Sequence, residues 1–276
     1  MSISILVLTL NEEQNLPDCL RSVAWAKDVV VLDSHSTDQT VAIAQGCGAR
    51  VVQRPFDNWA AHQNWAVENL RFANRWVFYL DADERMTPEL RAEIESIARD
   101  TSERRVAFYV VRKNFFMGRW IKHAMPPGYI MRFFVPASIR FERLVNPVPI
   151  MQGEHGYLHQ YILHYNFSKG IAEWIEKHNK YSTLEALEGM KEPGDAPGTQ
   201  PSLSSRDPAH RRRALKRLSF RLPARPLLKF LYMYFIQRGF LDGRAGFDYC
   251  VLQGIYEYMI TLKMTEAARR KRGLPV

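Results

Sequence analysis

The sequence predicts an α/β protein with a mostly parallel sheet, flanking helices and a helical C-terminal region. Short apolar runs alternate with segments of helical periodicity over the first half of the chain, which is typical of a parallel sheet with crossover helices. Several of these runs are almost continuously apolar, as strands covered on both faces are. Three of them end abruptly in polar residues, at the place where open α/β sheets bind ligands.

The first hundred residues give the elements in regular order. Pro17 and Pro88 suit the first turns of two helices, because the N–H that proline lacks would have no partner there. Gly46 and Gly48 close another helix. Strands are expected at 2–10, 28–33, 49–53 and 76–80, and helices at 16–26, 41–45, 59–72 and from Thr87-Pro88 onward.

The later elements end in a change of composition. Runs with β-like patterns cover 106–113 and 131–134, and a helix is expected from Ser168 to Leu187. Residues 191–208 then concentrate Pro, Gly, Ser and Asp, which favours a flexible linker. We therefore expect a catalytic domain over 1–190, a linker over 191–208 and a basic, aromatic-rich helical region over 209–276.

The polar strand ends indicate the chemistry. Asp81 and Asp83 follow a buried strand, and hard carboxylate oxygens suit Mg²⁺ or Mn²⁺ that holds a substrate diphosphate. The alternative is that these acids simply precede a helix, where negative charge is favoured. The chain has neither a G-x-G-x-x-G nor a Walker sequence after its first strand, so a Rossmann dehydrogenase or a P-loop NTPase is excluded. Phosphates would be bound through a metal.

Three motifs carry a family resemblance. Thr9-Leu10-Asn11-Glu12-Glu13, the run from Val31 to Thr40 and Leu80-Asp81-Ala82-Asp83-Glu84, in this order and spacing, resemble the family 2 glycosyltransferases of GT-A fold. The resemblance covers residues 1 to about 190. Further motifs are similar to the bacterial lipopolysaccharide-core β-1,4-glucosyltransferases: Phe116-x-Gly118-Arg119-Trp120-Ile121, Arg132-Phe133-Phe134 and Leu163-His164-Tyr165.

This resemblance implies a site for a nucleoside-diphosphate sugar, with UDP as the expected nucleotide. Thr9, Asn11 and Glu12 would face the nucleotide, and Asp33 would accept a hydrogen bond from the uracil N–H, since a carboxylate offers only acceptors. Asp81 would lie near the ribose and the metal. Asp83 would bind the Mn²⁺ or Mg²⁺ that neutralises the departing diphosphate.

The resemblance also implies an acceptor side. Arg119 and Trp120 would face the acceptor, or else pack at a domain edge, and Arg132 would touch a phosphate. His164 would complete the metal site or be a structural histidine.

An inverting transferase needs a carboxylate base. Where the relatives carry Val-His-Glu, this chain reads Val145-Asn146-Pro147. Glu84, Glu142 and Glu154 remain as candidates, and Glu84 is the best placed in sequence.

Charge and cysteine content define the setting. The three scattered cysteines favour a reduced, cytoplasmic compartment. Residues 206–276 hold 16 of the 38 Lys and Arg residues and five of the 29 Asp and Glu residues, a net charge of +11, which leaves −2 for the rest of the chain. Such a tail favours an anionic surface. With no RNA-binding signature, nucleic acid is excluded as a partner.

The tail is too often charged to cross a membrane. Its longest charge-free spans, 230–237 and 249–256, have eight residues each, whereas a bilayer crossing needs about 20. Short helices rich in aromatic residues and arginine suit the membrane interface. The alternative is a helical hairpin packed on the catalytic domain or on a second subunit of a homo-oligomer.

We therefore expect an inverting, metal-dependent glycosyltransferase. It would move a sugar from a UDP-sugar to a lipid-linked or lipopolysaccharide-type acceptor at the inner face of the cytoplasmic membrane. Transfer to a polyprenyl phosphate is the alternative within the class. An inactive membrane scaffold for a polysaccharide assembly complex is the alternative from another class. The sequence names neither the sugar nor the linkage.

Overall fold

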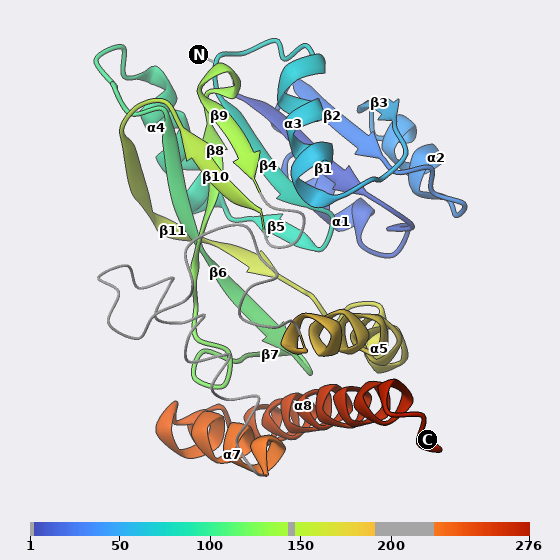
Figure 1. The fold of residues 1–276 in the computed structure, drawn as a ribbon. Coiled ribbons are helices and arrows are strands. Elements are labelled where there is room, and N and C mark those ends of the chain that lie inside the picture. The colour runs from blue at the N-terminus through green and yellow to red at the C-terminus, as the bar shows by residue number, and fades with distance from the viewer. Residues whose placement is uncertain (1–2, 143–146, 191–223) are drawn as a thin grey trace. The chain divides into compact units, whose positions relative to one another are not determined.

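The structure, a computed structural model, describes residues 3–142, 147–190 and 224–276 (Figure 1). Asn146, the expected linker 191–208 and the start of the basic region lie outside the described residues. The chain divides into two compact units. The first comprises Met1–Trp120 and Pro127–Ser168, and the second comprises Ile121–Pro126 and Lys169–Val276.

The first unit is built on a mixed sheet. Its described strands run in the order β3-β2-β1-β4-β8-β6-β11-β5, with β7 paired to β6. A separate hairpin consists of β9 (Ile139–Glu142) and β10 (Val148–Met151). The sheet strands are β1 (Ser4–Thr9), β2 (Asp28–Asp33), β3 (Arg50–Gln53), β4 (Val77–Asp81), β5 (Glu84–Met86), β6 (Ala107–Phe116), β7 (Arg119–Trp120), β8 (Tyr129–Phe134) and β11 (His155–His164).

The predicted parallel core of the sheet is confirmed. β1 pairs in parallel with both β2 and β4, and β2 pairs in parallel with β3. β8 then enters antiparallel between β4 and β6, while β6 and β11 are again parallel. Because β8 is antiparallel to both β4 and β6, the strands β4 and β6 run in the same direction. The carboxyl ends of β1, β2, β4, β6 and β11 therefore lie at the same edge of the sheet.

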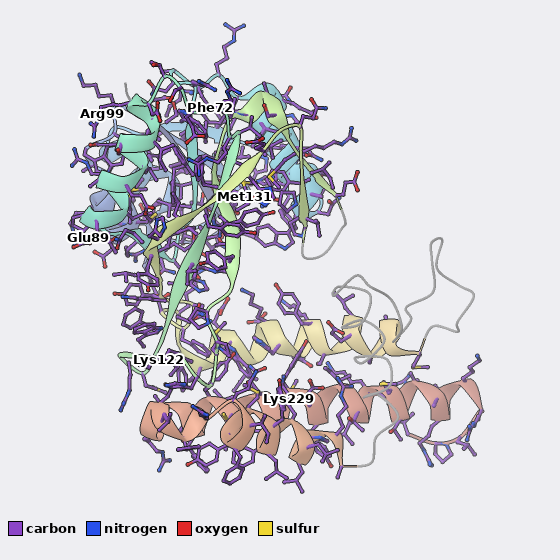
Figure 2. All side chains as sticks on the ribbon, turned by 90° about the vertical axis from the view of Figure 1, so that its left-hand side faces the viewer. Phe72, Glu89, Arg99, Lys122, Met131 and Lys229 are labelled. Atoms are coloured by element: carbon purple, nitrogen blue, oxygen red, sulfur yellow. The ribbon has the colours of Figure 1, made fainter. Side chains whose placement is uncertain are left out.

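Four helices of the first unit connect the early strands. They are α1 (Leu16–Ser22), α2 (Thr40–Gly46), α3 (Trp59–Asn69) and α4 (Pro88–Arg99). Asn58 caps α3 by accepting from Ala61 N, and Thr87 caps α4 by accepting from Leu90 N. Glu89 and Arg99 lie at opposite ends of α4 (Figure 2), where their charges complement the helix dipole. Such caps make the helix starts predictable from sequence.

Apolar residues cover both faces of the sheet. On one face, residues of α1 and α4 such as Leu16, Leu90 and Ile94 pack on Ile5, Val7 and other strand residues. On the other face, Ala60 and Ala66 of α3, together with the β9 residues Ile139 and Phe141, pack on Leu6 and Tyr79. Burial on both faces explains why the central strands are almost continuously apolar.

The second unit is helical. It contains α5 (Gly170–Gly189), α7 (Arg225–Leu231), a π-helical turn η2 (Tyr232–Ile236), a 3₁₀ turn η3 (Gly239–Asp242) and the long helix α8 (Gly243–Lys271). α8 contacts both α5 and α7. Lys263 of α8 donates to Asn179 Oδ1 of α5 at 2.6 Å. None of the helices that the structure describes is both long and apolar enough to span a bilayer.

Gly246 is a point of close backbone approach in this unit. A Cβ atom on Gly246 would lie 2.2 Å from the carbonyl oxygen of Gly239. We expect Gly246→Ala to lower the free energy of unfolding by roughly 1–3 kcal/mol through overpacking. Gly254→Ala is the matched control in the same helix, because its Cβ would meet nothing closer than 3.4 Å. It should gain up to about 1 kcal/mol of helix propensity. Equal urea midpoints for the two variants would contradict the close contact.

Candidate active site

The ends of β1 and β2 meet through Thr9 and Asp33, which are register partners. Asp33 is fully buried. Its carboxylate accepts from Thr9 Oγ1 at 3.0 Å, Gln53 Nε2 at 3.0 Å, and the Ser36 hydroxyl and backbone N–H at 2.5 and 2.9 Å. Burial alone would raise the pKa of Asp33, but these hydrogen bonds outweigh it and lower the pKa. The residue is therefore a fixed anion.

The loop after β1 is held to the loop after β2. Asn11 has a left-handed backbone (φ 54°), and its side-chain oxygen accepts from Thr37 N at 2.8 Å. The backbone N–H of Glu12 donates to Thr40 Oγ1 at 2.7 Å. The structure thus brings Thr9, Asn11, Glu12 and Asp33 together at one edge. These are the residues predicted to face the nucleotide.

Asp81 and Glu84 form a buried charge cluster with arginine. Arg132 Nη2 contacts the Asp81 carboxylate and lies 3.0 Å from Glu84 Oε1, while Arg112 Nη1 lies 3.4 Å from the same Glu84 oxygen. Tyr79 Oη donates to Asp81 Oδ1 at 2.6 Å. Burial would lower the pKa of Arg132, but the two carboxylates hold it well above its usual value.

This cluster changes the view of two predicted residues. Arg132 is only 6% exposed and is committed to two ion pairs, so its placement counts against contact with an acceptor phosphate. Glu84 has no exposed surface, and Asp81 N donates to its second oxygen at 2.9 Å. A general base must reach the hydroxyl that it deprotonates. The placement of Glu84 counts against that role, whereas Glu142 and Glu154 are both exposed.

Asp83 and His164 lie side by side. His164 Nε2 is 3.4 Å from Asp83 Oδ2. The other ring nitrogen, Nδ1, lies 2.7 Å from Asn114 Oδ1, which as an amide oxygen can only accept. In the neutral ring, Nδ1 therefore carries the proton and the lone pair of Nε2 is directed towards Asp83. The sheet register causes this arrangement, because His164 pairs with Asn114 on one side and with Glu84 on the other.

These donors fit a divalent cation. A carboxylate and a neutral imidazole are both metal ligands, and an imidazole whose second nitrogen donates to a fixed acceptor is the usual form of a ligating histidine. Mg²⁺ and Mn²⁺ complete their coordination shells with waters and substrate phosphates. Among the described residues no cluster of three or more such ligands occurs. The pair fits a cation that is shared with a substrate.

Arg119 and Trp120 are positioned by β6 and not by Asp83 or His164. They form β7, which pairs with Phe115 and Phe116 of β6. Arg119 is exposed, and the ammonium of Lys113 lies 4.7 Å from the centre of the Trp120 ring. Their predicted contact with an acceptor stays a prediction.

Four residues of the candidate site were not predicted from the sequence: Tyr79, Gln53, Arg112 and Asn114. Asn114 orients His164 from a position 50 residues earlier in the chain. Its position offered one sequence signal: Asn114 is a polar residue at the end of the run 106–113, at the same sheet edge as the acids.

His62 is a buried histidine near Asp33. Arg54 Nη1 donates to His62 Nδ1 at 2.9 Å, which leaves Nε2–H directed to Ser34 Oγ at 3.5 Å. Burial, together with the charge of Arg54, lowers the pKa of His62, although Asp57 opposes this. The neutral ring is the stable form in the folded protein.

A pH dependence of stability follows. Because the pKa of His62 is lower in the folded state, the unfolded chain binds the proton first as the pH falls below about 6.5. Wild-type protein should therefore lose stability between pH 7 and pH 5. His62→Asn keeps an acceptor for Arg54 but does not titrate, so the variant should lose less stability than the wild type over this pH range. Urea unfolding at each pH measures the free energy of unfolding of both proteins. If both proteins lose the same free energy of unfolding between pH 7 and pH 5, His62 does not cause the pH dependence.

A polar site at the carboxyl ends of parallel strands is typical of α/β enzymes that bind their ligands there. A family model described as Glycosyl transferase family 2 matches residues 4–159, more than half of the chain. The chain belongs to this family and is a glycosyltransferase. The mostly parallel sheet with flanking helices agrees with the predicted GT-A-type fold.

Individual relatives that match over almost the whole chain share about a quarter of their residues with it or fewer. An uncharacterized glycosyltransferase of Rickettsia typhi is 25% identical over 284 residues, covering 99% of this chain and 89% of the relative. The lipopolysaccharide core biosynthesis glycosyltransferase LpsC of Rhizobium meliloti is 24% identical over 276 residues, covering 96% of this chain and 92% of LpsC. The crystal structure of S. aureus TarS in complex with UDP is similar with a TM-score of 0.45 and 14% identity, covering 99% and 92% of the two chains.

Proposed function

We propose that this glycosyltransferase moves a sugar from a UDP-sugar to a lipid-linked or lipopolysaccharide-type acceptor, with inversion at the anomeric carbon and with Mn²⁺ or Mg²⁺. The site of action is the inner face of the cytoplasmic membrane, where such acceptors are presented. The observation that carries the proposal is the Asp83–His164 pair, whose facing oxygen and nitrogen lie 3.4 Å apart at the same sheet edge as Thr9 and Asp33.

The donor nucleotide binds across the ends of β1, β2 and β4. Thr9, Asn11 and Glu12 face the nucleotide, and Asp33 accepts the uracil N–H. A carboxylate has about four acceptor positions, and Asp33 already receives four hydrogen bonds within the protein. Uracil therefore replaces one of these donors, and Gln53, an exposed residue at the end of β3, is the one that can leave.

Asp83 and His164 hold the divalent cation, and Asp81 lies towards the ribose. When bound, the cation neutralises the negative charge that develops on the departing diphosphate. Asn114 keeps the Nε2 lone pair of His164 available by accepting from Nδ1. Arg132 holds the carboxylate of Asp81, and Glu84 accepts from its backbone N–H, so both fix its position. The protein thus binds and orients the donor with a prearranged set of charges.

The similarity to LpsC over almost the whole chain supports a lipopolysaccharide-type acceptor. Transfer to a polyprenyl phosphate is a second candidate, and it is favoured by the burial of Glu84, which counts against this residue as the base. A phosphate acceptor is already ionised and needs no base.

The proposal is tested by incubating the protein with radiolabelled UDP-sugars and lipid extracts, with Mn²⁺. Label in a lipid-linked glycan or in lipopolysaccharide supports it. Label that mild acid releases from the lipid as a free monosaccharide indicates the polyprenyl-phosphate product, whereas a diphosphate-linked glycan releases it within an oligosaccharide. No transfer from any UDP-, GDP- or CMP-sugar would favour the inactive scaffold.

Asp33→Asn should weaken UDP binding at least tenfold and leave Mn²⁺ binding almost unchanged. The amide replaces an acceptor with an N–H group that faces the donors of Thr9, Ser36 and Gln53. Calorimetric titration with UDP and, separately, with Mn²⁺ measures both effects. If Mn²⁺ binding suffers more than UDP binding, Asp33 does not belong to the base pocket.

A further inference from the structure

The second unit exposes an unusual concentration of apolar side chains between Leu227 and Phe247, a segment that we name the apolar corner. It comprises most of α7, the turns η2 and η3, and the start of α8. Large apolar residues are exposed throughout it, from Phe247 at 38% to Ile236 at 72%. They are Leu227, Leu228, Leu231, Tyr232, Phe235, Ile236, Phe240, Leu241 and Phe247.

The backbone of the apolar corner is tightly held. The buried Asp242 accepts from the backbone N–H groups of His123 and Ala124 at 2.8 and 2.7 Å. Arg225 forms an ion pair of 2.6 Å with Glu257 of α8. Gly246 leaves no room for a side chain against Gly239. These contacts hold the backbone that carries the exposed side chains.

The charges within the apolar corner are mainly positive. Lys229 and Arg238 lie among the exposed apolar residues, and Lys229 is marked in Figure 2. Arg244 also lies there, but its guanidinium pairs with Asp248 at 2.9 Å. The acid of this segment is Asp242, which is 2% exposed. In the sequence, residues 211–221, shortly before the corner, add six arginines and lysines. An apolar surface with such flanking charge matches a lipid bilayer that contains anionic headgroups.

We propose that the apolar corner is a membrane-docking surface that lies in the plane of an anionic bilayer. Leu227, Phe235, Ile236 and the other exposed apolar side chains enter the boundary between headgroups and acyl chains. Lys229 and Arg238 contact lipid phosphates. The corner docks without crossing, in agreement with the lack of a spanning helix among the described residues.

A second copy of the chain fits this surface less well. A coiled-coil contact between two copies would need a continuous apolar seam along one helix, whereas the exposed residues here are spread over a short helix, two turns and the start of another helix. Two copies would also bring Lys229 and Arg238 of each corner together, and like charges oppose association.

Docking at a bilayer would place the enzyme beside a lipid-linked acceptor, and in this respect the inference rests on the proposed function. The binding itself does not depend on glycosyl transfer. Vesicle binding and UDP binding are therefore measured separately. A protein that binds UDP but not vesicles contradicts only the docking proposal, and one that binds vesicles but not UDP contradicts only the proposed function.

The test uses the full chain and sedimentation with vesicles of phosphatidylcholine alone or with about 30% phosphatidylglycerol, whose anionic headgroups give the vesicle a negative surface potential. The wild type should bind the anionic vesicles more tightly, and added salt should weaken this binding. Phe235→Ser with Ile236→Ser should reduce binding at least tenfold. The matched control is Ile175→Ser with Leu184→Ser, two α5 residues that are 50% and 56% exposed, and it should bind like the wild type.

Charge is tested by Lys229→Gln with Arg238→Gln. This double variant should show a weaker preference for anionic vesicles than the wild type. Circular dichroism and UDP titration establish that each variant is folded. Equal vesicle binding by the Phe235/Ile236 variant and the wild type would overturn the proposal. So would a wild-type dimer in sedimentation velocity that this variant dissociates without any change in vesicle binding, because the corner would then be a contact between copies.

Discussion

Asp83→Asn is expected to lower the transfer rate on the order of a thousandfold or more, with the fold unchanged. Asp83 supplies the carboxylate of the Asp83–His164 pair, and a divalent cation contributes several kcal/mol to stabilising the leaving diphosphate. Each 1.36 kcal/mol corresponds to about a factor of ten in rate. The amide keeps the size of the side chain but removes its charge, so the cation loses its anionic ligand.

The measurement is the initial rate of UDP release with saturating donor, together with Mn²⁺ binding followed by electron paramagnetic resonance. Asp100→Asn is the control, because Asp100 lies at the end of α4 and its carboxylate accepts from the nearby Ser102. The control should keep wild-type rate and Mn²⁺ affinity. An active Asp83→Asn enzyme with normal Mn²⁺ binding would remove Asp83 from the metal site.

Arg132→Met is expected to lower the free energy of unfolding by roughly 3–5 kcal/mol, the cost of leaving buried charges without a partner. Arg132 lies between Asp81 and Glu84, and Glu84 is fully buried. Methionine fills much of the same volume without charge. Arg112, at 3.4 Å from Glu84 and 4.0 Å from Asp81, compensates only in part.

Urea unfolding at pH 7.5 measures this effect. Arg140→Met is the matched control, since Arg140 is an exposed residue of the neighbouring hairpin, and it should change stability by no more than about 0.5 kcal/mol. Adding Glu84→Gln to Arg132→Met should restore part of the lost stability by removing one of the unpaired charges. If Arg132→Met is as stable as Arg140→Met, the buried cluster contributes little.

The parallel half of the sheet was predictable because its signals are local. A strand that is buried on both faces is apolar along its whole length, and the end of that run marks the edge of the sheet. This placed Thr9, Asp33 and Asp81 at one edge, and the register pairs Thr9–Asp33 and Leu8–Asp81 agree with it. The helix starts were predictable from Pro17 and from the Thr87-Pro88 pair.

Contacts between distant parts of the chain were not predictable in this way. β8 enters the sheet antiparallel, so Arg132 reaches the Asp81–Glu84 acids from 51 and 48 residues further along. The sequence showed only a cation in an apolar strand, for which contact with a substrate phosphate and a buried ion pair are equally natural. The orientation of His164 by Asn114 likewise depends on the pairing of β6 with β11.

We propose that the Asp83–His164 pair and the Thr9–Asp33 edge form one site for a metal-bound nucleotide. Calorimetric titration of the full chain with UDP, in the presence and absence of Mn²⁺, measures this. UDP should bind at least tenfold more tightly with Mn²⁺, and it should be clearly preferred over GDP and CMP. Binding of UDP with the same affinity when EDTA replaces Mn²⁺, or binding of none of the three nucleotides, would contradict it.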